Sequence, residues 1–173
     1  MTDTNDNHDP SRRDFLYITT AVFGATGAAS VAWPLIDQLN PSASVSALSS
    51  IEADISSIPE GGSLKVAWRG KPIFIRRRTK EEIETAEKED SVDLPHPEKD
   101  LDRVKNKEWL VVVGVCTHLG CIPIADSGDF GGWFCPCHGS HYDISGRIRK
   151  GPAPTNLEIP PYEFVNENII KIG

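Results

Sequence analysis

Residues 116–121 (CTHLGC) and 135–142 (CPCHGSHY) are the most informative part of this 173-residue chain. Each segment follows an apolar stretch and places a histidine two or three positions after a cysteine. The pattern is C-x-H, then sixteen residues, then C-x-x-H. All four cysteines lie in these two segments, which points to one local site rather than to disulfides that staple a whole fold. Two short loops held side by side can therefore present two thiolates and two imidazoles.

Three kinds of site use cysteines and histidines in this way. A zinc ion could take two of each, but structural zinc loops favour Cys-x₂-Cys pairs, and Cys121 and Cys137 would have no role. Disulfides alone would use every cysteine and leave His118 and His138 idle. A [2Fe–2S] cluster with two histidines on one iron accounts for all six residues if Cys121 and Cys137 form a disulfide. We favour the cluster.

Both segments resemble those of the Rieske iron–sulfur proteins of cytochrome bc complexes, and the similarity extends to WRGKP at residues 68–72 and to the N-terminal region. The resemblance implies one [2Fe–2S] cluster as the cofactor. Cys116 and Cys135 would bind the inner iron as thiolates. His118 and His138 would bind the outer iron as neutral imidazoles, which leaves the cluster less negative and raises its potential.

The resemblance also assigns a disulfide to Cys121 and Cys137. The two cysteines are sixteen positions apart. Closing a loop of that length stabilises the fold by about 3 kcal/mol in the chain-entropy account. Such a bond persists only in an oxidising compartment. It therefore implies a domain that lies outside the cytoplasm.

Further roles near the cluster follow from the same resemblance. Ser140 and Tyr142 match positions whose hydroxyls donate hydrogen bonds to cluster sulfurs and raise the potential further. His138 matches the catalytic residue that faces the quinol, where an imidazole can take a proton as the cluster takes an electron. Two other histidines, His96 and His141, match no ligand position, and we interpret them as surface or structural residues.

Three more residues match an apolar cover around the cluster tip. They are Leu119, Gly151 and Pro152, which would seat against the quinol pocket of cytochrome b. The alternative for the proline is a stiff turn without a docking role.

The N-terminal region predicts a membrane anchor. Residues 15–36 contain no charged side chain, and a helix of that length covers about 33 Å, enough for a hydrocarbon core of about 30 Å. Arg12 and Arg13 precede it, so the positive-inside rule leaves residues 1–14 in the cytoplasm. The arginine pair resembles a twin-arginine export signal. A cleaved signal peptide ending near residues 30–32 and a buried core helix are the alternatives.

Residues 40–50 (NPSASVSALSS) are mostly small or polar and carry no charge, which is typical of a flexible tether. If the cluster must move between a quinol pocket and a distant haem, this segment is expected to act as a hinge. An inert linker is the alternative. The predicted domains are therefore a tail (1–14), an anchor helix (15–36), a hinge (37–50) and a Rieske domain (51–173).

The pattern after residue 50 predicts a mainly β domain. Residues 65–75 predict a hairpin that turns near Gly70, and the apolar run 109–115 predicts a fully buried strand. Further strands and turns are expected at residues 131–135, 142–148 and 159–172.

One helix is expected to interrupt the strands. Thr79 and Glu82 have the spacing of a capping box, and helix-forming residues continue to about Glu89. Residues 90–107 then predict a charged, proline-containing excursion. The predicted fold is a small antiparallel Rieske-type β domain with an inserted helix and a cluster-binding subdomain, preceded by one N-terminal transmembrane helix.

The net charge of −7 argues against nucleic acid as a partner. The resemblance implies the iron–sulfur subunit of a quinol–cytochrome c oxidoreductase, active only with cytochrome b and a c-type cytochrome. It would contribute to proton translocation in a dimeric complex of the bacterial inner membrane, with the cluster on the periplasmic side. One alternative is a Rieske ferredoxin or oxygenase domain, which usually lacks the extra cysteines and the anchor. Another is a Rieske subunit of a different membrane complex, although residues 79–107 look more like the respiratory type.

Overall fold

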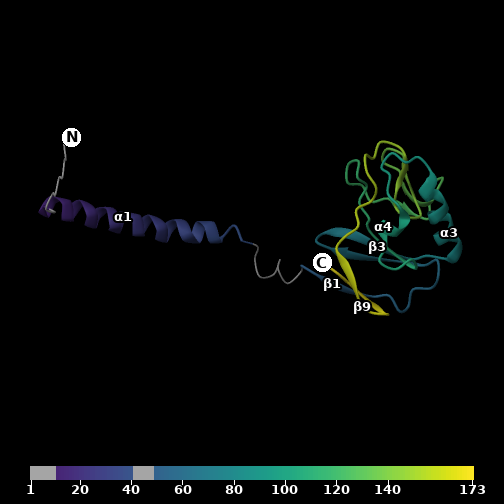
Figure 1. The fold of residues 1–173 in the computed structure, drawn as a ribbon, viewed down its shortest axis with the longest axis horizontal. Coiled ribbons are helices and arrows are strands. Elements are labelled where there is room, and N and C mark those ends of the chain that lie inside the picture. Colours follow the sequence, from purple (N-terminus) through teal and green to yellow (C-terminus); the bar gives the residue numbers. More distant parts are fainter. Residues whose placement is uncertain (1–10, 41–48) are drawn as a thin grey trace, which may run out of the picture. The chain divides into compact units, whose positions relative to one another are not determined.

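A computed structural model describes residues 11–40 and 49–173 of the chain. The chain divides into an N-terminal unit that ends at Ser46 and a second unit, Ala47–Gly173, drawn together in Figure 1. Most of the predicted tail (1–10) and the centre of the predicted hinge (41–48) lie outside the described residues. Each unit is described by itself.

The described residues of the N-terminal unit form the helix α1 (Arg12–Asp37), which includes the whole predicted anchor. Ser11 caps it, because its hydroxyl accepts from the Asp14 backbone while the Asp14 carboxylate accepts from the Ser11 backbone. Hydroxyls along the helix donate to the carbonyl four residues earlier, which satisfies them without water; they belong to Thr19, Thr26 and Ser30. By length and composition the helix can cross a membrane, a test that a signal sequence also passes.

Within residues 49–173, the described part of the second unit, the strands form three antiparallel sheets. Their strand orders are β1-β10-β9, β2-β3-β4 and β5-β6-β7-β8. The strands are β1 (Ile51–Asp54), β2 (Ser63–Trp68), β3 (Lys71–Arg77), β4 (Trp109–Val113), β5 (Ile124–Ala125), β6 (Gly131–Cys135), β7 (Ser140–Asp143), β8 (Ile148–Lys150), β9 (Tyr162–Asn166) and β10 (Ile169–Ile172). The mainly antiparallel β fold predicted from the sequence is therefore confirmed.

The first two sheets enclose one apolar core. The predicted hairpin is β2–β3, and its turn has positive φ at both Arg69 (49°) and Gly70 (74°), the geometry that suits the twist of a two-residue hairpin. Strand β4 pairs with β3 and is buried at every position, as its continuous apolar run predicts. The core is made of Ile55, Ile73, Ile75, Val111, Val113, Tyr162, Ile170 and Ile172, among others.

The third sheet carries a second core and both cysteine loops. Trp133 on β6 and Tyr142 on β7 pack with Phe74, and the same core contains Cys116 and Cys135. Strands β6 and β7 approach closely at Gly132, where an added Cβ would lie 2.0 Å from the Asp143 carbonyl oxygen. Only glycine permits that approach.

Between β3 and β4 the chain forms α3 (Lys80–Lys88), a 3₁₀ turn η1 (Glu89–Ser91) and a short helix α4 (Asp100–Arg103). Helix α3 and its Thr79–Glu82 capping box confirm the prediction. Helix α4 was not predicted. The excursion expected over residues 90–107 is partly buried, with Asp100 and Arg103 almost inaccessible to solvent, because each of these charges has a partner of opposite sign.

Candidate metal centre

Two loops of similar construction carry the cysteines and histidines. Loop 1 (residues 116–121) follows β4, and loop 2 (residues 135–140) joins β6 to β7. In each loop the first cysteine's carbonyl accepts a hydrogen bond from a glycine with positive φ, Gly120 in loop 1 and Gly139 in loop 2. Both loops therefore turn tightly, and each turn lies next to a cysteine and a histidine of the candidate site.

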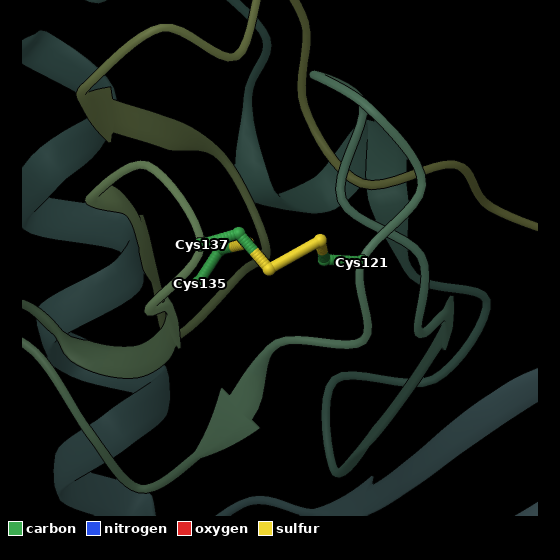
Figure 2. A group of neighbouring side chains, drawn as sticks. All are labelled: Cys121, Cys135 and Cys137. Atoms are coloured by element: carbon green, nitrogen blue, oxygen red, sulfur yellow. A yellow bond between two sulfur atoms is a disulfide. The ribbon is translucent and has the colours of Figure 1, made fainter.

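The two loops are joined by a disulfide between Cys121 and Cys137, as predicted. Figure 2 shows this bond with Cys135 beside it, and the three sulfurs lie within 4.8 Å of one another. Oxidised sulfurs carry no thiolate charge, so these three cysteines do not form a three-thiolate metal site. The free thiols are Cys116 and Cys135, and each is 2% exposed.

The two free thiols have different proton affinities. Burial acts to raise the pKa of Cys116, but hydrogen bonds from the Tyr142 hydroxyl and the His118 backbone outweigh it, so this pKa is lowered. Burial and the hydrogen bond with Cys116 raise the pKa of Cys135. Cys116 is therefore the readier thiolate, and a cation between the two sulfurs would favour both thiolates.

His118 and His138, one in each loop, lie side by side with ring centroids 4.6 Å apart and rings nearly perpendicular. His138 is exposed and His118 half-buried. The Nδ1 atom of His118 is buried and has no hydrogen-bond partner among the described residues. An unsatisfied buried nitrogen costs about 1–3 kcal/mol, and coordination to a metal would remove that cost. Two buried thiols and two adjacent imidazoles thus fit a [2Fe–2S] cluster with mixed ligands.

Ser140 and Tyr142 are both held with their hydroxyl protons available. The Ser140 oxygen accepts from the backbone of Ala153 at 3.2 Å, and its hydroxyl also helps to lower the pKa of Cys116. The Tyr142 oxygen accepts from the backbone of Thr117 at 3.2 Å, and its proton is donated to the Cys116 sulfur at 3.3 Å. Burial and that bond raise the pKa of Tyr142, so the phenol stays protonated and remains a donor.

The residues of the predicted apolar cover lie near the two histidines: Leu119 in sequence, and Gly151 in space. Leu119 follows His118 and is 70% exposed. Gly151 and Pro152 are also exposed. Gly151 has φ +104°, and an added Cβ would lie 2.5 Å from the carbonyl oxygen of Gly139, the residue after His138. The segment 151–155 therefore lies directly against loop 2.

Two histidines outside the two loops, His96 and His141, have structural contacts. His141 accepts from the backbone of Asp129 at 3.1 Å, and His96 accepts from the backbone of Asn156 at 3.4 Å. Sequence reasoning missed Thr117, whose hydroxyl donates to the Thr155 carbonyl at 2.7 Å. Its position between Cys116 and His118 was the only available signal.

A cavity of about 770 Å³ lies elsewhere, between Trp109 and Phe164. No cysteine or histidine lines it. The candidate centre is instead formed by two loops at the surface, so a reaction partner would have to cover it.

A family model described as "Rieske [2Fe-2S] domain" matches residues 51–163. The chain belongs to the Rieske family. Its cofactor is the [2Fe–2S] cluster of that family, as the sequence predicted. Residues 2–42 match the description "Ubiquitinol-cytochrome C reductase Fe-S subunit TAT signal", which confirms the twin-arginine prediction.

Curated Rieske relatives resemble the chain over almost its whole length. The ubiquinol-cytochrome c reductase iron-sulfur subunit of Blastochloris viridis is 57% identical over 98% of this chain and 97% of its own. That of Rhodospirillum rubrum is 54% identical over 95% and 93%. The mitochondrial cytochrome b-c1 complex subunit Rieske of Zea mays is 55% identical over 95% of this chain and 62% of its own.

A solved structure has a similar fold. A chain of a structure described as a hyperthermophilic respiratory Complex III has a TM-score of 0.55 and is 30% identical, covering 89% of this chain and 98% of that one.

Proposed function

We propose that this Rieske protein is the iron–sulfur subunit of a ubiquinol–cytochrome c reductase. It accepts an electron and a proton from quinol at a pocket shared with cytochrome b, passes the electron to a c-type cytochrome, and so contributes to proton translocation. The names of its relatives and the respiratory complex that contains its structural neighbour support this role. The chain is active only within that complex, which we propose to be dimeric.

The observation that carries this proposal is the exposed His138 beside His118, on the two loops that also carry the buried thiols of Cys116 and Cys135. We assign Cys116 and Cys135 to the inner iron and the two histidines to the outer iron. The unpartnered Nδ1 of His118 supports binding through that atom, which leaves Nε2 on the other side of the ring. A substrate can then reach the centre only from the side of the two histidines.

When bound, the cluster supplies a one-electron acceptor of raised potential. With its other ring nitrogen on iron, a neutral His138 would carry its one proton on Nε2, and the bound metal would favour loss of that proton. In the deprotonated form, Nε2 accepts a hydrogen bond from the quinol hydroxyl and takes its proton, the catalytic role we assign to this residue. Leu119, Gly151 and Pro152 surround this contact, exclude water from it and seat against cytochrome b. Ser140 and Tyr142 donate hydrogen bonds toward cluster sulfur and favour the added negative charge.

The N-terminal unit fits a retained membrane anchor. Helix α1 is uncharged between Asp14 and Asp37 and can span a bilayer. Arg12 and Arg13 at its start keep the N-terminus in the cytoplasm, which leaves the Rieske domain on the periplasmic side of a bacterial inner membrane. The Cys121–Cys137 bond needs the oxidising conditions of that side. Residues 37–50 would serve as the hinge. The mass of the membrane-bound protein separates a retained anchor from a cleaved signal.

Electron paramagnetic resonance on membranes reduced with ascorbate, with and without an inhibitor of quinol oxidation, tests the function. A rhombic signal with a mean g below the free-electron value, altered by the inhibitor, is the expected result. A signal that needs a stronger reductant and ignores the inhibitor would contradict the quinol role and favour the ferredoxin alternative. Metal analysis that found zinc in place of iron would contradict the cluster itself.

A further inference from the structure

A buried asparagine lies behind the cluster loops and takes no part in the proposed chemistry. Asn156 is 5% exposed, and its whole polar side chain is used. Its Oδ1 accepts from the backbone of Ile148 at 3.0 Å, and its Nδ2 donates to the His96 carbonyl at 3.2 Å and to Glu98 at 2.9 Å. These partners lie 8 to 60 positions away in the chain. Asn156 therefore connects β8 to the segment between α3 and β4.

The partners of Asn156 are themselves held in place. Glu98 also pairs with Arg103, which is 2% exposed. The guanidinium of Arg103 donates to the carbonyls of Ser145 and Leu157, each at 2.7 Å. Leu157 directly follows Asn156. Side-chain and main-chain hydrogen bonds therefore anchor this short stretch to the segment between α3 and β4.

This anchored stretch directly follows residues 151–155, here called the docking loop. Two further hydrogen bonds fasten the loop to the cluster site. The Ala153 backbone donates to Ser140, and the Thr155 carbonyl accepts from Thr117 at 2.7 Å. Thr117 stands between Cys116 and His118. The position of the docking loop therefore sets the hydrogen bonds of residues on both cluster loops.

We propose that Asn156 is a positioning residue for quinol oxidation. It holds the docking loop against loops 1 and 2 through His96 and Glu98, and thereby aligns Ser140 and Thr117 with the cluster sulfurs and Pro152 with cytochrome b. This inference rests on the proposed function and adds a residue that touches neither iron nor quinol. The segment between α3 and β4 thus serves as a support for the cluster site.

The variant Asn156→Asp tests the role with almost no change of shape. Its carboxylate can still accept from Ile148, but it cannot donate to His96 or Glu98, and it places a second negative charge beside Glu98. The matched control is Asn106→Asp. Asn106 is exposed, and its Oδ1 accepts from the backbone of Glu108 at 2.9 Å, an interaction that aspartate preserves.

Both variants are measured in the assembled, membrane-bound complex. Quinol-dependent cytochrome c reduction is divided by the amount of cluster, which is obtained by integrating the paramagnetic signal. We expect Asn156→Asp to lower this turnover roughly tenfold, because displacements near 1 Å can cost up to about a hundredfold. We also expect a smaller fraction of its cluster to be reduced at a fixed ascorbate poise. Asn106→Asp should match the wild type in both.

Wild-type turnover and cluster reduction in Asn156→Asp would overturn the inference. If this variant holds no cluster, the milder Asn156→Ser replaces it, and wild-type turnover per cluster there, or loss of cluster there too, would reduce Asn156 to a folding role. Failure of the proposed function looks different, since the wild-type complex itself would then show no inhibitor-sensitive quinol oxidation.

Discussion

The Tyr142 hydroxyl donates its proton to the Cys116 sulfur across 3.3 Å, although the two residues are 26 positions apart. The same oxygen accepts from the Thr117 backbone and lies 3.3 Å from the Thr117 hydroxyl. Hydrogen bonds to sulfur favour the more negative, reduced form of an iron–sulfur cluster. This contact therefore links the folding of the β6–β7 hairpin to the potential of the centre.

Replacing Tyr142 with Phe should lower the potential of the cluster. The ring keeps its place in the core while the donor is lost, and a hydrogen bond to a charged group contributes about 1.5–3 kcal/mol. Loss of part of this hydrogen-bond free energy shifts the one-electron reduction equilibrium of the cluster about tenfold, or about 60 mV. Redox titration of the paramagnetic signal measures the shift. Tyr162→Phe is the control, because that hydroxyl accepts from Lys105, remote from the cysteines. Equal potentials in wild type and Tyr142→Phe would contradict the tuning role.

Removing the disulfide through the double variant Cys121→Ser, Cys137→Ser should cost stability. The chain-entropy account gives about 3 kcal/mol, which corresponds to a melting temperature lower by roughly 10 °C. Thermal unfolding followed by circular dichroism measures it, and wild-type protein under a strong reductant should approach the variant. A melting temperature that is unchanged by both treatments would show that loops 1 and 2 do not depend on this bond.

Replacing Gly151 with Ala should impair turnover as well as stability. The new Cβ would meet the Gly139 carbonyl oxygen at 2.5 Å, so the docking loop must move away from loop 2. Gly70→Ala is the matched control, since Gly70 also has positive φ (+74°) but nothing lies within 4 Å of an added Cβ. Each loses about 1 kcal/mol to backbone strain. Quinol turnover per cluster should fall only in Gly151→Ala, and an equal fall in both would contradict the role of the loop contact.

Glu98 should make the domain sensitive to acid. Burial acts to raise its pKa, but hydrogen bonds and charge from Asn156 and Arg103 outweigh it and hold the pKa below the ordinary 4.5. As the pH falls, the Glu98 carboxylate is therefore protonated in the unfolded chain before it is protonated in the folded chain. The stabilisation is complete above about pH 6 and is lost as the pH falls below about 4.5 through the lowered value. Urea unfolding across this range should show a smaller acid loss in Glu98→Gln, whereas Glu60→Gln, at an exposed position, should match the wild type.

Much of the fold was predictable because its signals are local. The β2–β3 turn needs positive φ at neighbouring residues, and Gly70 supplies it. Thr79 and Glu82 cap α3 across three positions. The uninterrupted apolar run of β4 can only be a buried element. Boundaries inside the charged stretch after α3 were not predictable, because a run of lysines and acids has the composition of a solvated loop whether or not it is covered.

The sequence by itself determined the kind of centre. The types and spacing of its cysteines and histidines restrict the metal, and short loops place such neighbours together whatever surrounds them. Only the tertiary structure decided what supports the centre. Arg103 and Asn156 are ordinary polar residues in the sequence. Each is buried because the fold brings a complementary group from dozens of positions away, such as Leu157 for Arg103 and Glu98 for Asn156. A buried charge or amide is tolerated only with such partners, and long-range pairing of that kind has no local pattern.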